Sequence, residues 1–116
     1  MKFLYTFSML ILVSNNSFIN SIEKISTENV ISAIENNNYS YIEEILDKRL
    51  IGRNDLFNGK TLIIHAVIND NGEMINLLVR KGCSLQVTCE EGYLPIEWAE
   101  KLNKIYALAE IIVISA

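Results

Sequence analysis

The sequence has little of the chemistry that enzymes and nucleic-acid-binding proteins use. Its 116 residues include one histidine, one proline and two cysteines, and only 10 lysines and arginines against 14 aspartates and glutamates. The formal charge of −4 and the scattered basic residues argue against nucleic-acid binding, because phosphate contacts require clustered Lys and Arg. Half of the residues are hydrophobic and 21% are charged, which indicates a globular protein with one compact domain.

The scarce histidine and cysteine residues form no recognisable catalytic or metal-binding pattern. His65 has no nucleophile at a meaningful spacing, and a catalytic or metal site needs several convergent groups. Cys83 and Cys89 lack both C-x-x-C spacing and a paired histidine, which argues against zinc. We therefore expect no enzyme activity, no metal and no cofactor. Two free thiols are the default expectation, and a disulfide between them is the alternative in an oxidising compartment.

The amino terminus has the layout of a secretory signal. One lysine precedes an apolar run over residues 3–13, and a polar stretch follows. We predict a signal peptide over residues 1–21, with cleavage after Ser21 or, alternatively, after Ser17. The run is shorter than the roughly 20 apolar residues that span a bilayer, so export is favoured over an uncleaved membrane anchor or an apolar helix packed on the domain.

A pattern of 33 residues occurs three times in the rest of the chain. One column of identical alanines and four columns of large apolar residues coincide at this shift, and their steps of three and four residues are typical of one helix face. The aligned positions are Val30, Ile63 and Ile96; Ala33, Ala66 and Ala99; Ile42, Ile75 and Leu108; Ile45, Leu78 and Ile111; and Leu46, Val79 and Ile112.

Polar residues divide each copy into two helical segments. Runs rich in Asn, Asp and Gly occur at 36–38, 69–72 and 103–104, and these residue types favour turns and tolerate left-handed backbone. Gly82 follows Lys81 where a helix is expected to end. Each unit is therefore predicted to be a helix, a short turn, a second helix and a connector.

These residues resemble the ankyrin repeat, a 33-residue unit that opens with G-x-T-P-L-H-x-A and continues with L-L-x-x-G-A. The second copy reads GKTLIIHA at 59–66 and LLVRKGC at 77–83, and the third reads GYLPIEWA at 92–99. Pro95 fits the first turn of a helix. The first copy keeps only the apolar columns. The resemblance implies an all-α fold, a short solenoid of about three helix–turn–helix repeats with hairpin-like connecting loops.

The sequence departs from the family pattern in the loops. The motif histidine of the family falls on Ile64 and Glu97, so its Thr–His hydrogen-bond network is expected to be absent. The connector aspartate falls on Leu56 and Cys89, so irregular hairpins are expected. The predicted divisions are the leader at 1–21, a degenerate first repeat at 22–57, a second repeat at 58–90 and a third, truncated repeat at 91–116.

The resemblance implies protein–protein binding on a concave surface built from loop tips and first helices. We expect a protein partner, with aromatic residues supplying buried area and loop charges supplying specificity. Because the leader predicts export, the partner is expected outside the producing cytoplasm, and a host-cell protein is one candidate. The expected contact residues are Asp55, Phe57, Asn58, Lys60, His65, Ile68, Asn69, Thr88, Glu90, Glu91, Tyr93 and Trp98.

Two other interpretations stay open at this point. The apolar segments at 3–13 and 111–114 are compatible with a membrane-tethered protein or with self-association through the carboxyl end. The chain is also compatible with a remnant of a longer repeat protein that has no present function.

Overall fold

The computed structural model describes residues 25–116, so the leader predicted at 1–21 lies outside the described residues. This part of the chain is all-α, as predicted, and its β pairing is limited to one bridge between Phe57 and Lys60. Its helices are α2 (Thr27–Glu35), α3 (Tyr39–Asp47), α4 (Leu62–Ile68), α5 (Gly72–Arg80), α6 (Pro95–Lys101) and α7 (Ile105–Ser115).

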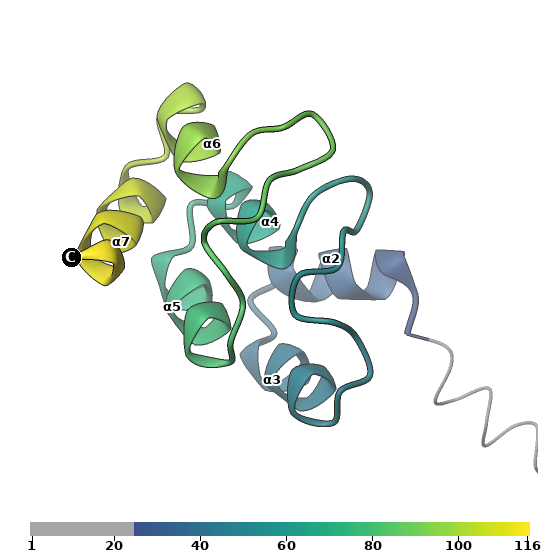
Figure 1. Cartoon of the computed structure of the whole chain (residues 1–116). Coiled ribbons are helices and arrows are strands. Elements are labelled where there is room, and N and C mark those ends of the chain that lie inside the picture. The colour runs from purple at the N-terminus through teal and green to yellow at the C-terminus, as the bar shows by residue number, and fades with distance from the viewer. Residues whose placement is uncertain (1–24) are drawn as a thin grey trace, which may run out of the picture.

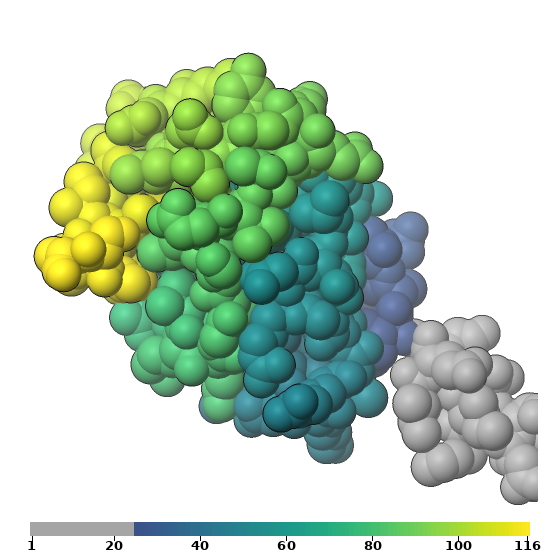
Figure 2. Space-filling view, viewed as in Figure 1, coloured from purple at the N-terminus to yellow at the C-terminus, as the bar shows by residue number. Residues whose placement is uncertain are grey.

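The helices are arranged in two layers (Figure 1). Helices α2, α4 and α6 contact one another in chain order and form the first layer, while α3, α5 and α7 form the second. Short turns join α2 to α3, α4 to α5 and α6 to α7, so each unit is a helical hairpin. The units stack in sequence order, and α2 and α7 therefore lie at opposite ends of the molecule (Figures 1 and 2).

The 33-residue period is present in the backbone. The second-layer helices begin at Tyr39, Gly72 and Ile105, at intervals of 33 residues. The turn before each of these helices contains one residue in the left-handed region, as the polar turn residues predicted. These residues are Asn37 (φ 59°), Asp70 (φ 53°) and Asn103 (φ 57°).

The start of each second-layer helix has a side-chain cap. Asn38 accepts a hydrogen bond from the Tyr41 N–H at the start of α3, and Asn71 accepts one from the Met74 N–H at the start of α5. The corresponding residue before α7 is Lys104, which gives no such bond. The Oδ1 of Asp70, in the preceding unit, accepts the Ala107 N–H at 2.8 Å instead. The cap of α7 is therefore also a link between two units.

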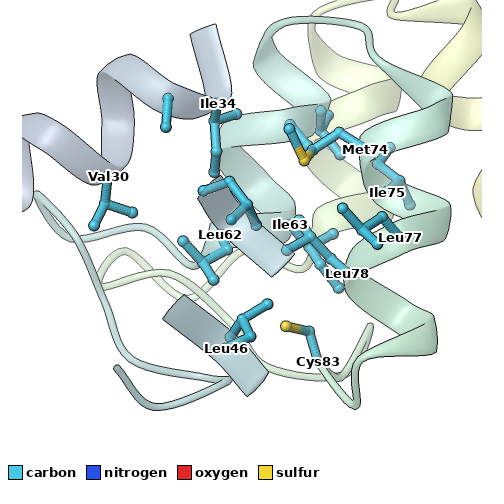
Figure 3. Packing of buried hydrophobic residues seen from close by; sticks show 14 of the residues in the cluster. Val30, Ile34, Leu46, Leu62, Ile63, Met74, Ile75, Leu77, Leu78 and Cys83 are labelled. Carbon is cyan, nitrogen blue, oxygen red and sulfur yellow. The ribbon is translucent and has the colours of Figure 1, made fainter. Parts of the chain in front are cut away.

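The aligned apolar columns form the core between the two layers (Figure 3). The three column alanines are buried, which lets the two helices of a unit approach closely. In Figure 3, Ile34, Leu62, Ile63 and Leu78 come from three different helices and point into one interior. Burial declines along the last column, from the buried Leu46 through the partly buried Val79 to the exposed Ile112.

Polar contacts also join the first unit to the second. The ammonium group of Lys81 lies 2.8 Å from a carboxylate oxygen of Glu43 and 3.1 Å from one of Asp47, both on α3. Hydrogen bonds to these two carboxylates raise the pKa of Lys81. At the turns, the Tyr39 hydroxyl donates to Glu73 at 3.1 Å. The stack is therefore joined by polar groups at its surface as well as by apolar packing.

The connectors at 48–61 and 81–94 lie side by side. Arg53 Nε donates to the Lys81 carbonyl, and the Ser84 N–H donates to Asn54 Oδ1 at 2.9 Å. Gly82 ends α5 as predicted, with φ of 100°, and a Cβ at this position would lie 2.7 Å from Arg53 Nε. The backbone angle therefore favours glycine, and a side chain here would displace Arg53 from its place beside Lys81.

The third unit contains both of the helices expected from its apolar columns, and α7 has 11 residues where α3 and α5 have 9 each. Within residues 25–116, no helix combines the length and the apolar content that crossing a membrane requires.

Candidate functional site

Two hairpin tips precede the first-layer helices α4 and α6. The first tip is a two-residue turn in which Phe57 and Lys60 exchange both backbone hydrogen bonds, at 2.7 and 3.2 Å. Asn58 and Gly59 have φ of 54° and 81°, and Asn-Gly is a preferred pair for such turns because both positions need positive φ. The tip is therefore specified by its own sequence.

The second tip is one residue longer. The Cys89 N–H donates to the Tyr93 carbonyl at 2.9 Å, and Gly92 closes the loop with φ of 91°. The two hairpins therefore differ in length, which agrees with the expected irregularity of the loops. The tips are joined by a 2.9 Å hydrogen bond from the Glu90 N–H to the Gly59 carbonyl. A Cβ on Gly59 would lie 2.7 Å from a carboxylate oxygen of Glu90.

An aromatic and lysine cluster lies where the tips meet α6. The rings of Tyr93 and Trp98 pack edge to face, with centroids 6.3 Å apart at 80°. The Lys60 ammonium lies 5.4 Å from the Trp98 ring, and the Lys101 ammonium lies 4.4 Å from the Tyr93 ring and 5.4 Å from that of Trp98. Cation–π contacts of this kind contribute about 0.5–1 kcal/mol each at exposed sites. We call these four residues the aromatic–lysine cluster.

Cys89 is buried next to this cluster and holds the indole ring of Trp98. Its sulfur accepts a hydrogen bond from Trp98 Nε1 at 3.4 Å, which orients the indole ring. Burial raises the pKa of the Cys89 thiol, but the Trp98 indole and the backbone N–H groups of Tyr93 and Glu91 outweigh burial, and the pKa is lowered. By contrast, burial raises the pKa of Cys83 to about 11, as expected for an inert core thiol. Both thiols are free.

His65 bonds inside the protein. Its Nε2 lies 2.7 Å from the Phe57 carbonyl, and because a carbonyl only accepts, Nε2 carries the proton. Burial lowers the pKa of His65, with Lys60 adding to the effect and the Phe57 carbonyl and Glu35 opposing it. The imidazole therefore ties the first tip to α4.

The structure separates the expected contact residues into three groups. Lys60, Tyr93 and Trp98 belong to the aromatic–lysine cluster, in which Tyr93 is 39% exposed. The remaining tip residues are exposed and lie in the two connectors. These are Asp55, Asn58, Thr88, Glu90 and Glu91. Asp55 also accepts the Gly52 N–H at 2.7 Å, so its carboxylate is partly used within its own loop.

Some expected contact residues lie elsewhere. Phe57 was expected to supply contact area, but its side chain is only 7% exposed because the tight turn directs it into the core. Ile68 and Asn69 lie at the opposite end of α4 from the tips, and the Asn69 side chain donates to the Ile34 carbonyl at 3.1 Å. Phe57 is therefore a core residue, and Asn69 is a link between two first-layer helices.

Lys101 was missed by the sequence analysis. It follows Trp98 by three residues on α6, and residues three apart on a helix are neighbours, so the spacing was a usable signal. The cation–π contact with Tyr93 had no sequence signal because it depends on how the second tip folds back over α6.

A hollow away from the tips lies on the second layer. It has a volume of about 650 Å³ and is lined by Tyr39, Glu43, Glu73, Asn76, Leu77, Arg80 and Glu110, none of which belongs to the tips. Several of its polar groups bond to one another, as Arg80 Nε does to Asn76 at 2.7 Å. Residues 25–116 contain no group of three or more His, Cys, Asp or Glu side chains placed to hold a metal ion.

The exposed features near the tips are thus two linked hairpins, a fixed pair of aromatic rings and two lysines that lie over those rings. Their chemistry suits non-covalent contact with another molecule. No protein-family model matches this sequence, and no curated protein or solved structure with significant similarity was found.

Proposed function

We propose that this chain is a non-catalytic ankyrin-type repeat protein that binds a protein partner through its hairpin tips and first-layer helices. The observation that carries the proposal is the aromatic–lysine cluster, in which Tyr93 and Trp98 are held at a partly exposed surface. Aromatic residues of this kind are enriched among the residues that dominate binding energy at protein interfaces.

The ankyrin-type assignment is supported by the repeat of backbone features. Left-handed turn residues recur at intervals of 33 residues, and hairpin tips precede α4 and α6. Stacked helical hairpins of this kind present tips and first-layer helices as one surface, which is the concave side of an ankyrin-type stack.

Preorganisation supports binding at this surface. The indole of Trp98 is fixed by Cys89, and the two tips are fixed to each other through the Glu90 N–H and the Gly59 carbonyl. Side chains that are already ordered lose less conformational entropy on association, so more of the contact energy appears as affinity. We infer that a partner meets a rigid platform here.

The proposed location of the partner follows from the leader. The apolar run at 3–13 supports export, which places the partner outside the producing cytoplasm, with a host-cell protein as one candidate. An uncleaved leader would instead anchor the domain at a membrane, with the same surface available for binding.

Site-specific photocrosslinking tests the proposal. A photoreactive phenylalanine analogue is placed at Asn58 in the first tip and, as a matched control, at Glu44 on the solvent side of α3. The proteins are exposed to extracts from the compartment in which the mature chain is recovered. We expect a crosslinked protein from the Asn58 position only, and its yield should fall about tenfold or more when Trp98→Ala is added.

Equal products from both positions, or a yield that Trp98→Ala leaves unchanged, would contradict binding at the tips. A purified chain without a cooperative thermal transition would support the remnant interpretation instead.

A further inference from the structure

Helix α7 is apolar on its exposed side as well as on its buried side. Ala107 and Ile111 face the core, while Ile105, Tyr106, Ile112 and Val113 are 65%, 72%, 55% and 68% exposed. Successive helix residues are 100° apart, so the exposed residues share an arc of about 120° with Ala109 at its centre. We call Ile105, Tyr106, Ala109, Ile112 and Val113 the outer face of α7. A helix that is apolar all round is ordinarily buried on all sides.

The contact between α5 and α7 shows how another helix would pack on the outer face. Gly72 and Asn76 of α5 lie against α7, where Asn76 donates to Glu110 at 3.1 Å and Gly72 is close to Glu110 and Tyr106. The residues 33 positions later are Ile105 and Ala109, on the outer face. The outer face therefore continues the packing surface that joins α5 to α7, and it has the position at which another helix would pack.

The outer face also lacks the charges of its equivalent on α5. Where α5 has Glu73 and Arg80, α7 has Tyr106 and Val113. The one charged residue within α7, Glu110, is hydrogen-bonded to Asn76 and lies beside the outer face. Covering the outer face would therefore bury no unpaired charge, which is the main cost of burying a surface.

The two ends of the described stack differ. At the other end, α2 exposes Glu28, Asn29 and Ser32, and a shallow hollow of about 250 Å³ there is lined mainly by polar residues. This polar end does not match an apolar helix face, so head-to-tail stacking of copies is disfavoured. The outer face is matched by the same face of another copy, and such a contact closes with twofold symmetry.

We propose that two copies of this chain pack tail to tail, α7 against α7, with Ala109 near the twofold axis. Each partner buries about 800 Å² in a standard interface, and the four large apolar residues of the outer face, each more than half exposed, would form the centre of such a contact. Leu102, which is 39% exposed just before α7, adds to the same end of the molecule. This interface leaves the hairpin tips free, so the dimer presents two partner-binding surfaces.

Light scattering and sedimentation of the full chain over a range of concentrations test the dimer. We expect twice the 13.2 kDa mass of the chain, or of its processed form, at high concentration, with reversible dissociation on dilution. Val113→Glu should weaken association about a hundredfold or more, because it places two unpaired carboxylates in an apolar contact. Leu56→Glu is the matched control, since Leu56 is an apolar residue that is 43% exposed in a connector. It should leave association unchanged.

A cysteine crosslink tests the twofold geometry. In a background with Cys83→Ala and Cys89→Ala, Ala109→Cys should form a disulfide-linked dimer with oxidised glutathione as the oxidant, and Leu56→Cys should not. A monomer at every concentration, a dimer insensitive to Val113→Glu, or assemblies that grow beyond two copies would overturn the proposal. So would a monomer that binds lipid vesicles through the outer face.

Discussion

At the residue scale, the single histidine has a structural role. The Nε2–H of His65 donates to the Phe57 carbonyl and so joins the middle of the first-layer helix α4 to the hairpin before it. Burial disfavours the charged imidazolium and lowers the pKa of His65. The neutral form is therefore the one that the native fold prefers, and this has a consequence for stability at mildly acidic pH.

We expect His65 to make the protein less stable as the pH falls. Its native pKa is lower than its unfolded pKa, so the unfolded chain binds more protons between the two values, and the free energy of unfolding rises with pH there. The contribution is complete above the unfolded value of about 6.5 and is lost as the pH falls through that value toward the native pKa.

Urea unfolding at pH about 7.5 and about 5.5 measures this effect, since the window brackets an ordinary histidine pKa. His65→Gln is the control, because its amide nitrogen can donate to the same carbonyl without titrating. The midpoint should fall at the lower pH in the natural protein and fall less in His65→Gln. Parallel losses in the two proteins would assign the pH dependence to other groups.

Parts of the candidate site could be located from the residues themselves. Tyr93 and Trp98 were identified through their variable positions in the repeat, and Cys83 as a buried thiol through its small-residue column. Phe57 was assigned wrongly because the direction of its side chain depends on the Asn-Gly turn that follows it. Contacts such as that of Lys101 with Tyr93 depend on tertiary folding, and no local pattern specifies them.

At the element scale, the turns between paired helices restrict which residue types they can contain. Asp70 has φ of 53°, where most side chains are strained, and its carboxylate caps α7 through the Ala107 N–H. One residue thus closes the turn within its own unit and begins a helix of the next.

Asp70→Ala should lower the free energy of unfolding by about 1–2 kcal/mol through loss of the cap, and by about 1 kcal/mol more through left-handed strain. Asp70→Asn should cost much less, because its amide oxygen can accept the same bond and asparagine tolerates positive φ. Urea unfolding of the three proteins measures the differences. Equal losses for the two variants would show that the negative charge matters rather than the hydrogen bond or the backbone angle.

The helices were predicted well because their signals are local. The spacing of apolar residues and the polar turn residues specify each helix pair without reference to the rest of the chain. The first unit was considered degenerate because it lacks the G-x-T motif, yet Ser26 and Asn38 cap its two helices and make it as regular as the others. The second helix of the third unit was predicted from the same apolar columns, and α7 contains all three of their residues, Leu108, Ile111 and Ile112.

At the scale of the whole molecule, stability is shared between units. The first-layer helices contact only their neighbours in the stack, so the central unit holds the two outer ones together. Three units are about the minimum for a stable stack of this kind. A substitution that destabilises the central unit should therefore destabilise the whole molecule.

Leu78→Ala should lower the free energy of unfolding by about 2–5 kcal/mol, because Leu78 is fully buried at the centre of the core. Helical circular dichroism reports on all units, whereas Trp98 fluorescence reports on the third unit and on its contacts with Lys60 and Cys89. Both midpoints should fall together, and the exposed Leu56→Ala should change the stability by about 0.5 kcal/mol or less. Separate midpoints would show that the units unfold independently.

The hydrogen bond between the two hairpin tips holds the shape of this surface without using the side chains that are exposed on it. Gly59 and Glu90 are joined through a backbone carbonyl and a backbone N–H, so the bond needs no particular side chain at position 90. Any residue except proline can donate it. Residues 90 and 91 are therefore free to change during evolution while the platform keeps its shape, and a new partner can be acquired by substitution at the tips without a new fold.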